Sequence, residues 1–114
     1  MKILTLLLIL LAFSVQAEEY EAVDVEVKAQ KLIGDAYYVP GMSGAATEYE
    51  GFISNAGFVV TNEGVVVFDA LGTPSLAHAM LGEIRKITDQ PIKIVVMSHY
   101  HADHLYGLQV FKDE

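Results

Sequence analysis

Apolar and polar residues alternate strictly over residues 23–28, VDVEVK, which is the pattern of a strand with one buried face. A second strand is predicted at residues 36–39, AYYV, because a Pro-Gly pair follows it directly. Small and polar residues dominate from 41 to 51, so this stretch is expected to be a loop. These patterns predict two strands and a long connection.

A hairpin is predicted next. Residues 52–61, FISNAGFVVT, have strand character, and a bulge is expected among the small and polar residues 54–57. The turn residues Asn62-Glu63-Gly64 separate this strand from a second one at residues 65–68, VVVF. Because the second run is apolar at every position, it is expected to be covered on both faces.

The spacing of the apolar residues then changes from two to three and four. Residues 74–87 are predicted to form an amphipathic helix, with Thr73 as its N-cap and Pro74 as its first residue. Its apolar stripe consists of Leu76, Ala77, Met80, Leu81, Ile84 and Ile87. Another buried strand is predicted at residues 92–97, IKIVVM, and a further helix over residues 103–111.

The order of these elements predicts the fold class. An antiparallel meander followed by strand, helix, strand and helix indicates an α/β fold of the α+β type, with a mixed sheet and helices on at least one face. Both strands beside the first helix, at residues 65–68 and 92–97, have the composition of strands that are covered on both faces. A second covering layer is therefore expected, although the 97 residues after position 17 hardly provide it.

The first 17 residues are predicted to be a secretory signal peptide. Met1-Lys2 is positively charged, residues 3–13 are apolar, and Val15-Gln16-Ala17 is a cleavage site of the small-x-small type. The apolar run is too short for a comfortable bilayer span, although an uncleaved anchor is the rival interpretation. We expect a secreted or periplasmic protein that is cleaved after Ala17, with no stable membrane insertion afterwards.

Charge and cysteine content narrow the chemistry. The chain of 114 residues has a formal charge of −8, which becomes −9 once Lys2 leaves with the signal peptide. A polyanionic partner such as nucleic acid is therefore not expected. The chain has no cysteine, so it has no disulfide and no thiolate to offer a metal ion.

Residues 98–107, SHYHADHLYG, gather three of the four histidines within six positions, directly after a predicted buried strand. His99 and His101 are two apart, so in an extended segment both imidazoles project to the same side. Asp103 and His104 are adjacent and diverge by about a quarter-turn at the start of a helix, which suits a second position close to the first. Imidazole and carboxylate ligands without sulfur suit zinc, iron or manganese. Such a cluster is hard to interpret as a chance group of surface histidines.

This motif resembles the signature of the metallo-β-lactamase superfamily. The earlier stretch SNAGFVVTNEGVVVFDALGTP resembles the first hairpin of that family, and IRKITDQPIKIVVMSHYHADHLYG resembles its helix, connection and motif strand. The resemblance covers most of residues 51–107. It implies half of an αβ/βα sandwich of two mixed sheets with flanking helices.

The resemblance also implies the site. His99 and His101 would bind a first metal ion, and Asp103 and His104 a second one, with two zinc ions in the full-length protein. Asp103 would also orient a hydroxide that attacks a small-molecule substrate. Asp69 would hydrogen-bond to the motif loop and orient it, although a simple turn carboxylate at a strand end is an equal alternative. The function implied is that of an exported metal-dependent hydrolase.

The family pattern requires a further histidine, a bridging aspartate and a last histidine downstream of the motif, whereas this sequence ends at Glu114. We therefore interpret residues 18–114 as the N-terminal part of a truncated domain that is inactive alone. His78, expected to be a partly exposed helix residue, is no substitute ligand. Two alternatives remain: an amidohydrolase, and a small exported metal-binding domain without enzymatic activity. The sequence indicates neither the substrate nor the oligomeric state.

Overall fold

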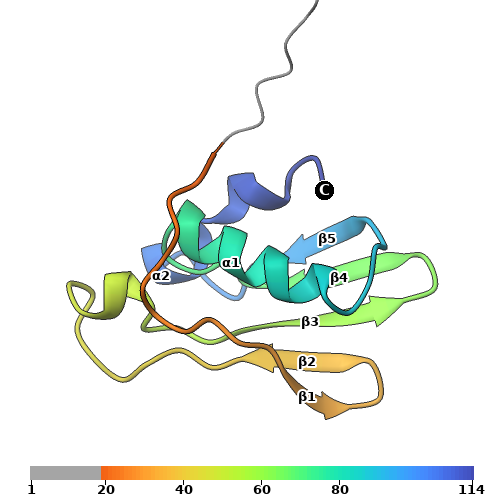
Figure 1. Ribbon diagram of the computed structural model, residues 1–114, viewed down its shortest axis with the longest axis horizontal. Coiled ribbons are helices and arrows are strands. Elements are labelled where there is room, and N and C mark those ends of the chain that lie inside the picture. The colour runs from red at the N-terminus through yellow and green to blue at the C-terminus, as the bar shows by residue number, and fades with distance from the viewer. Residues whose placement is uncertain (1–18) are drawn as a thin grey trace, which may run out of the picture.

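A computed structural model describes residues 19–114, which form a five-stranded mixed sheet with helices beside it (Figure 1). The predicted signal peptide, residues 1–17, lies outside the described residues. The strands are β1 (Gln30–Ile33), β2 (Ala36–Val39), β3 (Ala56–Thr61), β4 (Gly64–Phe68) and β5 (Ile92–Val96), in that spatial order. The first four form an antiparallel meander, and β5 pairs with β4 in parallel. The predicted mixed sheet is confirmed.

The crossover between β4 and β5 is made by α1 (Pro74–Arg85), which packs on one face of the sheet (Figure 1). The helix begins as predicted, since the Thr73 hydroxyl accepts a hydrogen bond from the Leu76 N–H at 3.1 Å. It ends two residues before Ile87, which is 40% exposed. The buried stripe of α1 and the inward side chains of the sheet form one core: Leu76, Ala77, Met80, Leu81, Ile84, Val39, Phe58, Val65 and Val67.

The opposite face of the sheet is uncovered over the described residues. Val66 pairs with Ile94 and Phe68 with Val96, so these side chains share the face that points away from α1. Ile94 is 54% exposed and Phe68 43% exposed. The prediction that both strands are covered on two faces is therefore wrong for residues 19–114. Their apolar composition predicts a layer on each face, whereas α1 covers only one face among the described residues.

The alternating segment at residues 23–28 is not a strand, which corrects the first prediction. Val23, Val25 and Val27 do pack against the core, as the alternation indicated. The backbone, however, hydrogen-bonds to side chains: the Asp24 and Val25 N–H groups donate to Glu50 Oε2 at 2.8 and 3.0 Å. The segment runs past α1 before it reaches β1, and Tyr20 contacts His78 of that helix (Figure 1).

The predicted strand at residues 52–61 begins only at Ala56. It pairs with β2 and β4 without a shift of register, so the bulge expected at residues 54–57 is wrong. Residues 49–51 instead form a short 3-10 helix, and Phe52 is buried beside the loop that precedes it, where its carbonyl accepts from the Met42 N–H at 2.8 Å. The strand starts late because the residues before Ala56 pack beside that loop instead.

The helix predicted over residues 103–111 is divided into α2 (Ala102–Leu105) and a 3-10 helix, η2 (Leu108–Phe111). The break is at Gly107, which packs so closely that a Cβ there would lie 2.1 Å from the Ala70 carbonyl oxygen. Its N–H donates to Leu71 at 3.2 Å instead of continuing the helix.

Across residues 19–114, no helix combines the length and the apolar character needed to cross a bilayer.

Candidate metal centre

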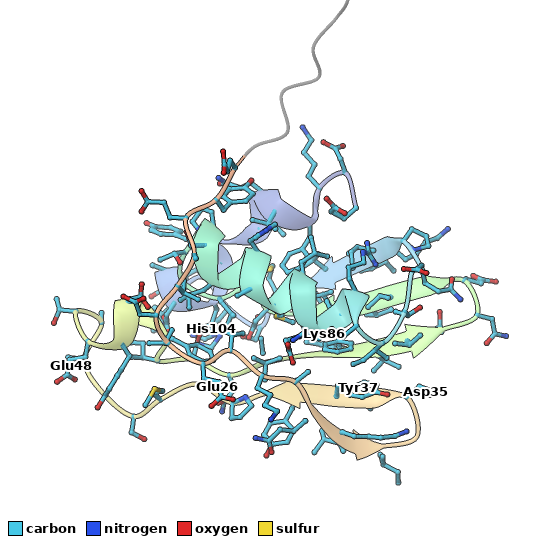
Figure 2. The ribbon with its side chains drawn as sticks, in the orientation of Figure 1. Glu26, Asp35, Tyr37, Glu48, Lys86 and His104 are labelled. Carbon is cyan, nitrogen blue, oxygen red and sulfur yellow. The ribbon has the colours of Figure 1, made fainter. Side chains whose placement is uncertain are left out.

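The motif lies at the carboxyl ends of β4 and β5, because these two strands are parallel and end side by side. The Asp69 N–H, directly after β4, donates to the Val96 carbonyl at 2.9 Å, and the motif begins two residues beyond Val96. Carboxyl ends of adjacent parallel strands are the usual place for a site in an open sheet. His104 accordingly lies in the same half of the molecule as Glu48, whereas Asp35 lies at the opposite end (Figure 2).

The carboxylate of Asp69 holds both ends of the motif. Its Oδ1 accepts from the Ser98 N–H at 2.7 Å, and its Oδ2 from the Ser98 hydroxyl at 2.7 Å and from His104 Nδ1 at 2.8 Å. Asp69 itself has a positive φ of 61°, an uncommon conformation outside glycine. In the structure, Asp69 thus contacts the motif loop, the segment that the resemblance implied it would orient.

Asp69 stays a carboxylate at neutral pH. Burial by itself raises its pKa, but the hydrogen bonds from the Ser98 N–H, the Ser98 hydroxyl and His104 outweigh the burial and lower the pKa below 3.8. A carboxylate only accepts hydrogen bonds, so every group facing it must donate. This requirement determines which of the atoms around the Asp69 carboxylate carry a proton.

The tautomers of two histidines follow from that network. The single hydroxyl proton of Ser98 points to Asp69, so the hydroxyl oxygen accepts from His99 Nδ1, 2.9 Å away. His104 likewise donates its Nδ1 proton to Asp69. Nδ1 of both rings therefore carries a proton, and Nε2, the nitrogen turned away from the supporting partner, faces another motif side chain: His101 in the case of His99 and Asp103 in the case of His104. Support of this kind is usual for metal-binding histidines.

The four motif side chains form two close pairs. His99 Nε2 lies 3.1 Å from His101 Nδ1, and Asp103 Oδ2 lies 3.3 Å from His104 Nε2. The rings of His99 and His104 are also neighbours, with centroids 4.1 Å apart. Two nitrogens bound to the same tetrahedral zinc at 2.0–2.1 Å lie about 3.3 Å apart. The spacing within each pair therefore fits a shared ion.

The four motif side chains fit a metal ion as two separate pairs and do not form a closed site. Among residues 19–114, no group of three or more histidine or acidic side chains converges in the manner of a metal site. Catalytic zinc sites usually have three protein ligands. His78 does not contribute, since it is exposed on α1 and contacts Tyr20.

Three residues that support this site were assigned no role in the sequence analysis. Ser98 links Asp69 to His99, and a hydroxyl residue just before the first histidine was a signal for it. Gly107 gives the close packing described above, for which the glycine in the motif was a signal. Ser54, whose hydroxyl donates to the Asp103 carbonyl, lies 49 residues away, and no spacing rule reaches that far.

The cavities differ in chemistry. A cavity of about 260 Å³ adjoins Asp103 and is also lined by Thr47, Glu50 and Thr73. A larger one of about 550 Å³ lies between β5 and η2, but its lining contains no histidine and no acidic residue. Of these two cavities, the smaller one adjoins the motif.

The sheet, the crossover helix and the histidine-aspartate motif at the strand ends are those of the metallo-beta-lactamase superfamily. The model of that superfamily matches residues 49–114, more than half of the chain, and the chain belongs to this family. The resemblance noted in the sequence is confirmed, and so is the fold class.

Among individual proteins, the chain is 38% identical over 52 residues to the linear primary-alkylsulfatase of Pseudomonas sp. (strain ATCC 19151), a match that covers 46% of this chain and 10% of that protein. The structure of the stereoselective inverting sec-alkylsulfatase Pisa1 from Pseudomonas sp. matches with a TM-score of 0.60 and 27% identity, over 76% of this chain and 12% of that one. A metallo-beta-lactamase from Pontibacter korlensis has the same TM-score at 24% identity, over 74% of this chain and 38% of that one, and shows the fold alone. The chain thus spans a small part of each relative.

Proposed function

We propose that the protein is a metal-dependent hydrolase, with zinc held by His99, His101, Asp103 and His104. The observation that carries this proposal is the pair of donor distances, 3.1 Å for His99 with His101 and 3.3 Å for Asp103 with His104. Membership of a superfamily that includes sulfatases and β-lactamases supports hydrolysis as the reaction. Iron or manganese would also suit these ligands.

The roles of the residues follow from their contacts. Bound zinc would lower the pKa of a water molecule and polarise the electrophile. Asp69 keeps a proton on Nδ1 of His104, and Ser98 does the same for His99, so Nε2 is the nitrogen left in each ring to bind a metal ion. The Asp103 carboxylate would accept a hydrogen bond from the attacking hydroxide and so orient it. Further ligands for a closed centre would come from outside residues 19–114.

We propose an alkyl sulfate ester as the first substrate class to test. The support is the 38% identity with a linear primary-alkylsulfatase. A β-lactam is the second class, for which the support is membership of the metallo-beta-lactamase superfamily. The net charge of −8 favours a small molecule over a polyanion. We further propose export with cleavage after Ala17, for which the support is the sequence pattern of residues 1–17.

The test measures metal content and hydrolysis in the protein at its natural length. His101→Ala is expected to lower the zinc content and to abolish alkyl sulfate hydrolysis, because it removes one donor of the first pair. His78→Ala is the matched control, since this histidine lies on α1 away from the motif. Full zinc content and full activity in His101→Ala would refute the proposed site.

A further inference from the structure

Ser54 anchors the motif independently of Asp69. It precedes β3, is 5% exposed, and donates a hydrogen bond from its hydroxyl to the backbone carbonyl of Asp103. We propose that Ser54 is a positioning residue for the Asp103 carboxylate and thereby for the second metal ion. This inference rests on the metal centre proposed above.

The Asp103 carbonyl needs a donor from outside its helix. The last carbonyls of a helix lack intrahelical partners, and α2 has only four residues. A longer helix would offer Asp103 the Gly107 N–H, but that group donates to Leu71 at 3.2 Å. The hydroxyl of Ser54 takes its place. The next carbonyl, that of His104, accepts from the Ala70 N–H at 2.7 Å.

Ser54 cannot move away from Asp103 without disturbing the core. A Cβ on Gly41 would lie 2.1 Å from the Ser54 carbonyl oxygen, so the two backbones are already in closest contact. Phe52, two residues earlier, is 1% exposed and fixes the chain on that side. A buried hydroxyl without a partner is costly, so the bond to Asp103 also stabilises Ser54 in its place.

The effect of Ser54 is confined to one of the two ligand pairs. Gly72 packs against Asp103 from another segment, where a Cβ would lie 3.2 Å from the Asp103 Cα, so the Asp103 backbone is held between Gly72 and Ser54. His104 keeps its own contacts with Asp69 and Ala70 when Ser54 is changed. Loss of the hydroxyl therefore loosens Asp103 selectively.

The experiment is a Co²⁺ titration of the protein at its natural length, followed by the visible spectrum of the bound ion. The parent is expected to bind two ions. Ser54→Ala is expected to bind the first with an unchanged spectrum and the second about 10–100-fold more weakly, the usual cost of losing support for a ligand. Thr61→Ala is the matched control, since its hydroxyl also donates to a carbonyl, that of Gly64 at 2.7 Å, at the far end of β3.

A double-mutant comparison isolates the route of the effect. In an Asp103→Asn background, Ser54→Ala is expected to weaken the second ion no further, because the group that it positions has already been changed. An additional loss in that background would show that Ser54 acts through another residue and would overturn the inference.

Other outcomes are equally decisive. Parent-like binding of both ions by Ser54→Ala overturns the inference. Equal weakening of both ions, or loss of the folded circular dichroism spectrum, also overturns it, because either result indicates a general structural role. Absence of cobalt binding in the parent itself refutes the proposed metal centre, and the inference with it, a failure recognised without any variant of Ser54.

Discussion

His104 Nδ1 lies 2.8 Å from Asp69 Oδ2, although 35 residues separate them in the chain. This hydrogen bond ties α2 to the residue directly after β4. It also requires a proton on Nδ1 of His104, because a carboxylate only accepts hydrogen bonds. A side chain outside the proposed ligand set thus orients one that belongs to it.

Replacement of Asp69 by asparagine is expected to weaken metal binding by about 10–100-fold, because the amide cannot accept from all the donors around it. Asparagine tolerates the positive φ of this position, so the fold is expected to persist. Isothermal titration with zinc measures the change. The exposed Asp89→Asn is the control, and unchanged affinity in Asp69→Asn would contradict the expectation.

Replacement of Gly107 by alanine is expected to destabilise the fold by about 1–3 kcal/mol or more, because the new Cβ would lie 2.1 Å from the Ala70 carbonyl oxygen and 2.5 Å from the Ala77 Cβ. Gly82 of α1 is the matched control, since a Cβ there has nothing within 4 Å. Gly82→Ala is expected to stabilise the helix by about 0.4–1 kcal/mol. Urea unfolding of both variants checks the pair, and effects of the same sign would count against this packing.

The acid stability of the chain is expected to depend on Glu83. Burial by itself raises its pKa, but Lys86, the Ala29 N–H and the charge of Lys28 outweigh the burial, so the pKa lies below its ordinary value of 4.5. The carboxylate therefore stabilises the fold fully above about pH 4.5, and this contribution is lost as the pH falls through the lowered pKa.

The corresponding variant is Glu83→Gln, which is expected to be less stable than the parent at pH 7, by at most about 1 kcal/mol, and to lose less stability on acidification. Urea unfolding at a series of pH values measures this difference. Glu63→Gln, in the exposed hairpin turn, is the control and is expected to follow the parent. Parallel curves for the parent and Glu83→Gln would exclude a role for this carboxylate.

The uncovered face of the sheet is expected to make residues 18–114 prone to association. Ile94→Thr, at a position 54% exposed, is expected to reduce association with little change in stability. Val67→Thr, at a position that is 0% exposed on the other face, is expected to cost about 1–3 kcal/mol, because it buries a hydroxyl. Sedimentation velocity measures the association, and urea unfolding measures the stability. A larger loss of stability in Ile94→Thr than in Val67→Thr would show that the two faces are assigned wrongly.

Residues 18–114 alone are expected to have no zinc-dependent hydrolase activity, because each pair supplies two ligands where a catalytic zinc site usually has three. Assays with alkyl sulfates and β-lactams, with and without added zinc, check this directly. Rapid turnover of either substrate by this segment would show that the four motif residues suffice.

The elements that sequence patterns predicted well are those whose signals lie within a few residues of each other in the chain. The N-cap at Thr73, the stripe of α1 and the strand at residues 36–39 all follow from such short patterns. The identity and spacing of His99 and His101 likewise determined that two imidazoles would face each other, because residues two apart in an extended segment share a side.

Only the tertiary structure decided the rest. The alternation at residues 23–28 showed that one side is buried, but not that the backbone bonds to Glu50 rather than to a strand. The apolar run of β5 could not show which face α1 would leave open. The contacts of Asp69 with His104 and of Ser54 with Asp103 span 35 and 49 residues and exist because parallel strands and packed loops end at the same edge. A pattern along the chain records periodicity and burial, whereas the partner of a buried polar group is determined by how distant segments pack in three dimensions.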